Sequence, residues 1–271
     1  MLHKVLKGIA PVLAFALAAG ISGCDGHISI NGHEGVPLSE LDLAGKTPTD
    51  VVLAGPDDVI VTHGDKLAID VSGDAEAKEA LRFTLDDGTL GVMRKNGSKS
   101  NGKATVRVTL PQLSKVTLAG SGTLDADSVT GKVEAVIAGS GTARLRSIET
   151  DKLELTIAGA GTLEGAGHAK SLELTVAGSG TAKMAGLKVD SAKITIAGSG
   201  DASFASDGTV DATVMGSGNV NVTGSAKCTI HSMGSGKLNC TAGTTSTTGG
   251  PPAPPAPPAA PTGPGPIPTP E

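Results

Sequence analysis

The stretch Leu155-Thr156-Ile157-Ala158-Gly159-Ala160-Gly161 decides the fold, because close copies of it recur through the second half of this 271-residue chain. Each copy ends in a Gly-x-Gly turn. The paired turn glycines are Gly120 and Gly122, Gly139 and Gly141, Gly159 and Gly161, Gly178 and Gly180, Gly198 and Gly200, Gly216 and Gly218, and Gly234 and Gly236. Successive turns are 18 to 20 residues apart. A fixed period of this size is typical of a solenoid.

Apolar and polar residues alternate on both sides of each turn. Before Gly159, for example, the apolar residues Leu153, Leu155 and Ile157 are separated by Glu154 and Thr156. Strict alternation predicts a strand with one buried face. We therefore predict an all-β fold, a right-handed parallel β-helix (solenoid) with coils of about 19 residues. The glycines suit corners that need positive φ and that stack too closely for a Cβ atom.

Changes in composition divide the chain into five parts. We predict a lipoprotein signal peptide over 1–23, a lipid-anchored tether over 24–50, irregular opening strands of the β-helix over 51–113, regular repeats over 114–242, and a disordered Pro/Thr/Gly-rich tail over 243–271. The tail has too few apolar residues to bury a core, and its proline content favours polyproline II conformations.

The N-terminus has the layout of a secretory leader. Lys4 and Lys7 precede an apolar run over residues 8–20, which is short for a membrane span. The run leads into Ile21-Ser22-Gly23-Cys24, which resembles the lipobox of bacterial lipoproteins. The resemblance implies cleavage before Cys24 and attachment of lipid to its sulfur, so that the chain is anchored to a membrane. The alternative is an ordinary signal peptide followed by a chance cysteine.

Charge and aromatic content exclude several classes of ligand. The formal net charge is −5, and it becomes −7 when cleavage removes Lys4 and Lys7. An acidic chain is a poor match for nucleic acid or anionic lipid. The chain has no Trp, no Tyr and three Phe, so it lacks the aromatic faces on which sugars and bases usually stack.

The repeats offer little that resembles an active site. A phosphate-binding loop needs a helix after its glycines, and here an alternating strand pattern follows each turn. Residues 118–236 contain no insertion large enough to build a cleft. We expect no catalytic residue, no cofactor and no specific metal site, although His27 and His33 could bind a metal weakly. The chain is therefore predicted not to be an enzyme.

Polar residues at equivalent positions predict ladders along the solenoid surface. Three residues before the first turn glycine stand Thr117, Val136, Thr156, Thr175, Thr195, Thr213 and His231; three residues after it stand Thr123, Thr142, Thr162, Thr181, Asp201, Asn219 and Lys237. Threonine is a good exposed strand residue, which is sufficient reason for these ladders. A binding surface for ice or for a repetitive polymer is the alternative. A third ladder alternates in charge through Asp125, Arg144, Glu164 and Lys183.

The last repeat contains two cysteines at positions that are apolar in earlier repeats. Cys228 lies six residues before Gly234, and Cys240 lies six residues after it. Both side chains should therefore point inward, and the leader directs the chain to an oxidising compartment. We predict a disulfide that closes the C-terminal end of the solenoid, provided the Cα atoms lie within about 7 Å of each other. Two free thiols in a small apolar core are the alternative.

Taken together, the Gly-Ser-Gly coils, the segment Val106-Arg107-Val108-Thr109-Leu110-Pro111 and the lipoprotein leader resemble the auto-transporter adhesin head GIN domain family, over residues 51–239. The resemblance implies a β-helix with an adhesin-like role and brings no catalytic residues. We expect a non-catalytic cell-envelope lipoprotein, an adhesin-like or scaffolding solenoid that presents a repetitive surface. Its expected partners are a membrane, through the lipid, and a cell-surface or cell-wall polymer. A polysaccharide-acting β-helix enzyme and an ice- or polymer-binding threonine ladder remain alternatives.

Overall fold

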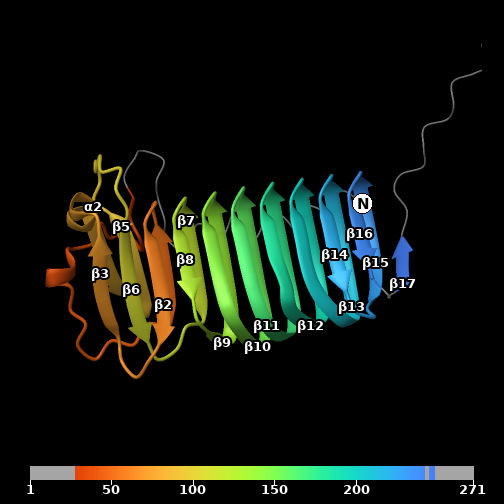
Figure 1. Ribbon diagram of the computed structural model, residues 1–271, viewed down its shortest axis with the longest axis horizontal. Helices are drawn as coiled ribbons and strands as arrows, with labels where there is room; N and C mark the ends of the chain where they lie inside the picture. The colour runs from red at the N-terminus through yellow and green to blue at the C-terminus, as the bar shows by residue number, and fades with distance from the viewer. Residues whose placement is uncertain (1–27, 242–243, 248–271) are drawn as a thin grey trace, which may run out of the picture.

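The computed structural model describes residues 28–241 and 244–247, which form an elongated β-solenoid with a more irregular N-terminal end (Figure 1). From Lys115 onward the strands of successive coils pair in parallel, and equivalent residues of neighbouring repeats face each other. Gly159, for example, pairs with Gly139 on one side and Gly178 on the other, at a repeat of about 19 residues. The predicted parallel solenoid is therefore confirmed.

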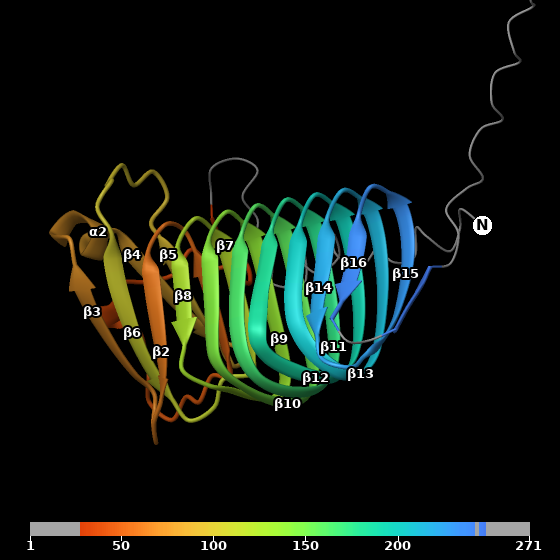
Figure 2. The same ribbon diagram turned by 45° about the vertical axis from the view of Figure 1, so that its right-hand side comes forward.

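The regular coils contain the C-terminal eleven of the seventeen strands. These strands are β7 (Lys115–Gly120), β8 (Thr123–Ala126), β9 (Val129–Gly139), β10 (Thr142–Gly159), β11 (Thr162–Gly178), β12 (Thr181–Gly198), β13 (Asp201–Gly216), β14 (Asn219–Thr223), β15 (Lys227–Gly234), β16 (Lys237–Cys240) and β17 (Thr244–Thr247). The long strands β10 to β13 bend, and Figure 2 shows two walls joined by a curved base.

We name the parts of a coil by their position in it. In β10, residues 142–145 belong to wall B, residues 148–150 to the base and residues 152–159 to wall A, and the Gly-x-Gly corner leads to wall B of the next coil. The pairing register shifts between Leu145 and Ile148, where the strand turns from wall B into the base. Such irregularities let a continuous strand change direction without losing its ladder.

The corner glycines are required by geometry. Gly159 has φ of +118°, and a Cβ atom built on it would lie 2.5 Å from the carbonyl oxygen of Gly139 in the coil before. A Cβ atom on Gly161 would lie 2.5 Å from a side-chain carbon of Ile137. Neither contact leaves room for a side chain. The close stacking of the coils therefore requires glycine at both positions of the turn.

Inward-facing residues form one narrow core along the whole length of the solenoid. Leu153, Leu155 and Ile157 of wall A are almost completely buried, as are Ala143 and Leu145 of wall B. Each coil contributes a single layer of inward side chains, so much of its buried area lies against the coils on either side. Stability then depends on contacts between neighbouring coils, as in other repeat proteins.

The N-terminal part is stacked out of sequence order. It contains β1 (Asp50–Ala54), β2 (Asp58–His63), β3 (Ala68–Gly73), α2 (Ala75–Ala80), β4 (Leu81–Asp86), β5 (Thr89–Arg94) and β6 (Ala104–Leu110). In wall A, β1 lies between β5 and β7; in wall B, β2 lies between β6 and β8; all four pairings are parallel. The first coil in sequence, formed by β1 and β2, is therefore the second along the axis. The coil formed by β5 and β6 is stacked before it, at the N-terminal end.

Two antiparallel strands end the solenoid on this side. β3 pairs antiparallel with β6, and β4 pairs antiparallel with β5. Between them, α2 begins at Asp74, whose side chain accepts a hydrogen bond from the Ala77 amide, and it buries Ala77 and Ala80 against the core. The irregular opening strands predicted over 51–113 are thus a cap that closes the end of the core.

Two predicted boundaries need correction. The tether predicted over 24–50 is wrong for residues 28–50, because Ile30 is completely buried and Val36 forms a β-bridge with Phe83. Leu38, in the short 3-10 helix Leu38–Glu40, and Leu41 also pack against the core. At the other end, Thr244–Thr247 form β17 and pair in parallel with β15, so the disordered tail predicted over 243–271 does not include them.

Candidate functional surface

The predicted polar ladders are present on the outer surfaces of both walls. On wall A, Thr156, Thr175, Thr195 and Thr213 are direct neighbours in successive coils. Wall A also carries an outward ladder of alanines one residue before each corner as far as Ala197, and methionines take this position before the last two corners. The threonine ladder is interrupted by Val136 and ends at His231. The result is a flat strip of small side chains, with hydroxyl groups repeating at the strand spacing of about 4.8 Å.

Wall B changes character toward the C-terminal end. There the threonine ladder continues from Thr181 into Asp201 and Asn219, and the Asp201 carboxylate accepts hydrogen bonds from the backbone and side-chain amides of Asn219, both at 3.0 Å. In the adjacent ladder, the side-chain amide of Asn239 donates to that of Asn221 at 2.9 Å. These residues line an open hollow of about 420 Å³. The hollow offers amide, carboxylate and hydroxyl groups at regular intervals.

The alternating charge ladder forms, but its pairing differs from the simple expectation. Asp125, Arg144, Glu164 and Lys183 are neighbours in register. The Nε atom of Arg144 lies 2.9 Å from the Glu164 carboxylate. Asp125 is bound instead by Arg146, whose Nε atom lies 2.7 Å from its carboxylate. Asp125, the expected partner of Arg144, is thus paired with a second arginine of the same coil.

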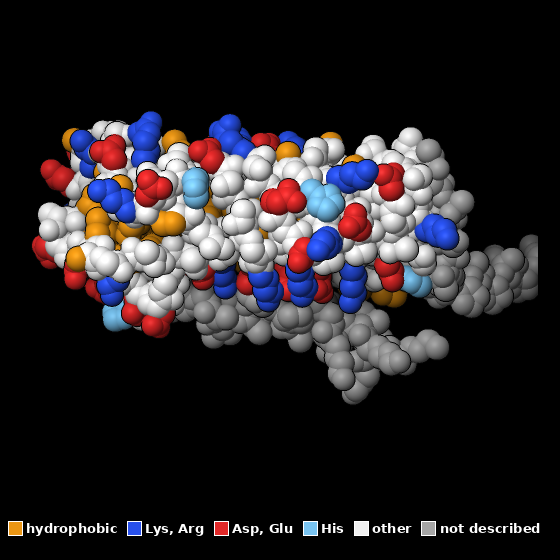
Figure 3. Space-filling view, turned by 90° about the horizontal axis from the view of Figure 1, so that it is seen from below, with side chains coloured by type: hydrophobic (Ala, Val, Ile, Leu, Met, Phe, Trp, Pro, Cys, Tyr) orange, Lys and Arg blue, Asp and Glu red, His pale blue; other side chains and the backbone are white. Residues whose placement is uncertain are grey.

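The base of the solenoid carries rows of acidic and basic side chains, which Figure 3 shows from below. His168 lies between two carboxylates from the neighbouring coils, with its ring nitrogens 3.8 Å from Glu149 and 3.5 Å from Asp190. Lys170 lies 2.6 Å from Asp151. Part of this surface borders an open hollow of about 570 Å³. Among residues 28–241 and 244–247, no three His, Cys, Asp or Glu side chains are grouped to bind a metal ion.

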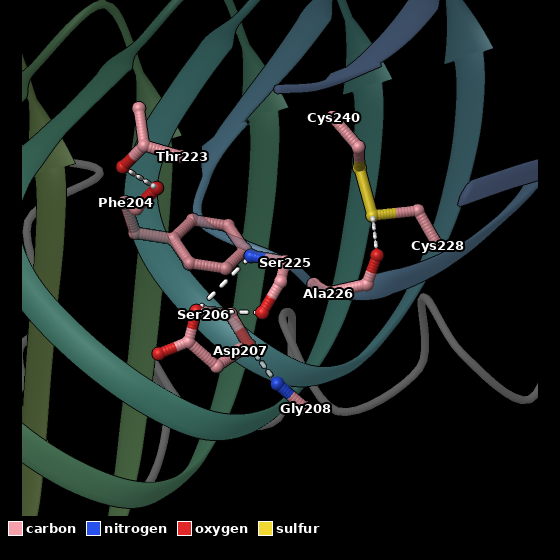
Figure 4. Close-up of a disulfide and its surroundings, with 9 residues drawn as sticks. All are labelled: Phe204, Ser206, Asp207, Gly208, Thr223, Ser225, Ala226, Cys228 and Cys240. Carbon is pink, nitrogen blue, oxygen red and sulfur yellow. Dashed lines mark hydrogen bonds between the residues drawn. A yellow bond between two sulfur atoms is a disulfide. The ribbon is translucent and has the colours of Figure 1, made fainter. Parts of the chain in front are cut away.

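One carboxylate on the base is strongly stabilised in its charged form. Lys188 binds Asp207 at 2.8 Å, and the Ser225 amide and hydroxyl each donate to it at 3.0 Å. The bond from Lys188, followed by the two from Ser225, lowers the pKa of Asp207 to about 2. Figure 4 shows the Asp207–Ser225 contact, which joins neighbouring coils. The ion pairs of the base therefore connect the coils to one another.

At the C-terminal end, Cys228 and Cys240 form a disulfide (Figure 4). Their Cα atoms are 6.7 Å apart, and the bond joins β15 of wall A to β16 of wall B across the interior. Cys228 is buried, and Cys240 continues the inward row of Phe204 and Val222 on wall B. The last complete coil is therefore closed by a covalent connection between its walls.

The N-terminal cap contains a buried ion pair that sequence reasoning did not find. Asp57, 1% exposed, accepts two hydrogen bonds of 2.7 Å from Arg94 and a third of 2.8 Å from the Ala104 amide. Arg94 also donates to the carbonyl oxygens of Ser100 and Gly102, both at 2.6 Å. Hydrogen bonding to Asp57 raises the pKa of Arg94. The pair joins residues 37 positions apart, and neither stands in a recognisable motif.

Two residues named from the sequence, Cys24 and His27, lie outside the described residues, together with the whole predicted signal peptide over 1–23. His33 is described and lies 3.6 Å from Asp86. In the part of the chain that the structure describes, no helix is long and apolar enough to span a membrane.

Comparison with known proteins places the chain in a family. Residues 47–226 match the family model described as "Putative auto-transporter adhesin, head GIN domain". No curated protein matches the chain significantly. The crystal structure of a "putative adhesin" from Bacteroides fragilis is 20% identical with a TM-score of 0.66, covering 72% of this chain and 93% of its own.

Two further crystal structures share the fold at similarly low sequence identity. A "putative lipid binding protein" from Parabacteroides distasonis is 23% identical, with a TM-score of 0.58 over 74% of this chain and 99% of its own. A "putative adhesin" from Parabacteroides merdae is 22% identical, with a TM-score of 0.54 over 73% and 97%. The family match covers well over half of the chain, and we conclude that this chain belongs to the auto-transporter adhesin head GIN domain family.

Proposed function

We propose that this chain is a non-catalytic, lipid-anchored protein of the bacterial cell envelope that binds a repeating polymer through wall B. The observation that carries the proposal is the hollow on wall B lined by Thr181, Asp201, Asn219, Asn221 and Asn239. Its polar groups repeat at the strand spacing, as the hydroxyl groups of a polysaccharide repeat along its chain. Such a surface binds through many weak contacts, each of modest energy.

The chemistry of this hollow suits hydroxyl-rich ligands. Asparagine amides both donate and accept hydrogen bonds, and a carboxylate accepts from neighbouring hydroxyls. The exposed amides of Asn221 and Asn239 are already aligned with each other by their 2.9 Å bond, so little side-chain freedom is lost when a ligand binds. Two structural relatives are described as adhesins, which agrees with a binding role.

The proposed anchor is a diacylglycerol group on the sulfur of Cys24. We expect Cys24→Ala to abolish incorporation of labelled fatty acid and to move the protein from the membrane to the soluble fraction. Fractionation of cells that express the two forms measures this. A mutant that remains in the membrane fraction like the unmodified protein would contradict the anchor.

The polymer site is tested by co-sedimentation with purified peptidoglycan sacculi and, in parallel, with surface polysaccharide from the producing cells. We expect the double substitution Asn221→Ala/Asn239→Ala to weaken binding about fivefold or more, because each lost hydrogen bond contributes roughly 1 kcal/mol. The matched control is Thr156→Ala/Thr175→Ala, which shortens an equivalent ladder on wall A. Equal binding by both double mutants, or no binding of the unmodified protein to either polymer, would exclude wall B as the site.

A further inference from the structure

The first described residues lie on the outer surface of wall A at the N-terminal cap. Ile30 is completely buried there in a small cluster with Val52, Ala54 and Met93, whose side chains point away from the main core. Gly91 makes room for it, because a Cβ atom at Gly91 would lie 2.8 Å from the Ile30 Cδ1 atom. The cluster is therefore a second, external core that holds the N-terminal segment against wall A.

Hydrogen bonds fix this segment on both sides of Ile30. The Ile28 amide donates to the Asn96 side chain at 2.8 Å, and Ile30 and His33 exchange two backbone hydrogen bonds of 3.0 Å across a tight turn. Val36 and Phe83 exchange two more, at 2.9 and 2.8 Å. The chain is thus part of the folded domain from Ile28 onward, and it leaves the domain at the outer surface of wall A.

Only four residue steps separate Ile28 from Cys24. A fully extended chain of that length spans at most about 14 Å. This inference rests on the acylation of Cys24 in the proposed function: if lipid is attached there, the outer surface of wall A near β1 and β5 cannot lie farther than this from the bilayer. We propose that wall A is the membrane-facing surface of the anchored protein and that wall B is directed away from the membrane.

The rest of wall A is compatible with a close approach to uncharged or zwitterionic headgroups. Its alanine ladder continues in register from Ala54 and Ala119 of the Ile30 contact, so the packed surface extends without a step. Charges at its border with the base neutralise one another: Lys115 lies 3.4 Å from Glu134, and Lys152 binds Glu154.

A pair of introduced cysteines tests the orientation. Thr175→Cys lies on wall A and Thr181→Cys on wall B, in neighbouring coils and on opposite sides of one Gly-Ser-Gly corner; both positions are half-buried strand threonines. With Cys24 acylated and Cys228 joined to Cys240, the introduced thiol is the only reactive one. The probe is a maleimide coupled to a polymer of several kilodaltons, applied to each mutant in phosphatidylethanolamine/phosphatidylcholine vesicles and again in detergent.

In vesicles, we expect Thr175→Cys to react about tenfold or more slowly than Thr181→Cys, because a wall A that lies along the bilayer is shielded from the polymer. In detergent the two rates should be similar. Equal rates in vesicles, or protection of Thr181→Cys instead, would overturn the orientation while leaving the anchor intact. Failure of the unmodified protein to float with the vesicles would overturn the anchor itself, and the orientation with it.

A lengthened link separates the effect of the short tether from any other attraction. Inserting about 15 Gly/Ser residues between Asp25 and Gly26 allows the domain to move roughly 20 Å from the lipid. The protein should still float with vesicles, and Thr175→Cys should now react as fast as Thr181→Cys. Undiminished protection would show that the link does not set the orientation, which would contradict the proposal.

Discussion

The two ends of the solenoid are closed by different means. At the N-terminal end, antiparallel strands β3 and β4, the helix α2 and the buried Asp57–Arg94 pair cover the core. At the C-terminal end, the repeat continues until the Cys228–Cys240 bond joins its two walls, and β17 adds one more strand. The first end is closed by contacts that are distant in sequence, whereas the second is closed within a single coil.

The difference shows how a repeated sequence can be terminated. An open coil exposes unpaired strand edges and the end of the core, which favours association with other chains. The N-terminal cap solves this with a change of strand direction, which needs many particular residues. The C-terminal end keeps the repeat, and its closure depends on one covalent bond between two inward cysteines. The two ends should therefore respond differently to substitution and to reducing agents.

The largest effect is expected at the N-terminal end. Asp57→Ala should lower the free energy of unfolding by about 3–5 kcal/mol, because it leaves the Arg94 charge buried without its partner. The control is Asp58→Ala, which removes the adjacent, more exposed pair with Lys103 at 3.4 Å and should cost about 0–1 kcal/mol. Urea unfolding of the purified proteins measures both. Similar costs for the two substitutions would mean that the buried pair does not hold the cap together.

Next in size is a substitution in the middle of the regular coils. Gly159→Val should destabilise the domain by about 3 kcal/mol or more, through positive φ and through crowding against the Gly139 carbonyl oxygen. Gly97→Val isolates the backbone effect, because Gly97 has φ of +73° and no heavy atom within 4 Å of a built Cβ. That control should cost roughly 1–2 kcal/mol. If thermal unfolding shows that Gly159→Val and Gly97→Val lose equal stability, close stacking of the coils is not the reason that glycine is required at position 159.

The disulfide should have a somewhat smaller effect, confined to the C-terminal end. Replacing both Cys228 and Cys240 by Ala should cost about 2–4 kcal/mol, since the bond closes a loop with a separation of 12 residues. Hydrogen exchange should increase first in β15 and β16 and leave the N-terminal cap unchanged. With the Cys24 sulfur modified by lipid as proposed, thiol titration of the denatured, non-reduced mature protein should find no free thiol. Two free thiols per chain would exclude the bond.

The smallest effect concerns the surface ladder on wall B. Arg144→Glu replaces the 2.9 Å pair with Glu164 by two like charges and should cost about 0–1 kcal/mol in low salt. The cost should shrink in high salt, because both side chains are partly exposed. Arg144→Gln removes the pair without adding repulsion, so its free energy of unfolding should lie between those of the unmodified protein and Arg144→Glu. An effect that does not depend on salt would exclude the electrostatic explanation.

The regular coils could be predicted from the sequence because every constraint on them is local and repeated. Alternation identifies the buried residues, and the period of Gly159 and its equivalents fixes the register, so one coil predicts the next. The N-terminal cap has no such repetition. That β1 lies between β5 and β7, or that Asp57 meets Arg94, depends on single long-range contacts. Likewise, Ile30 stands in a polar segment, and nothing in its neighbourhood indicates an external core.

The placement of β1 and β2 between later strands also determines the order in which the domain can form. Neither strand has both of its neighbours until β5 to β8 have been synthesised, so the chain through Ala126 must be present before the first coil is paired on both sides. Closing such distant contacts is slow, whereas each later coil adds to one already in place. The N-terminal half therefore sets the folding time, and coils could be added to or deleted from the C-terminal half without altering it.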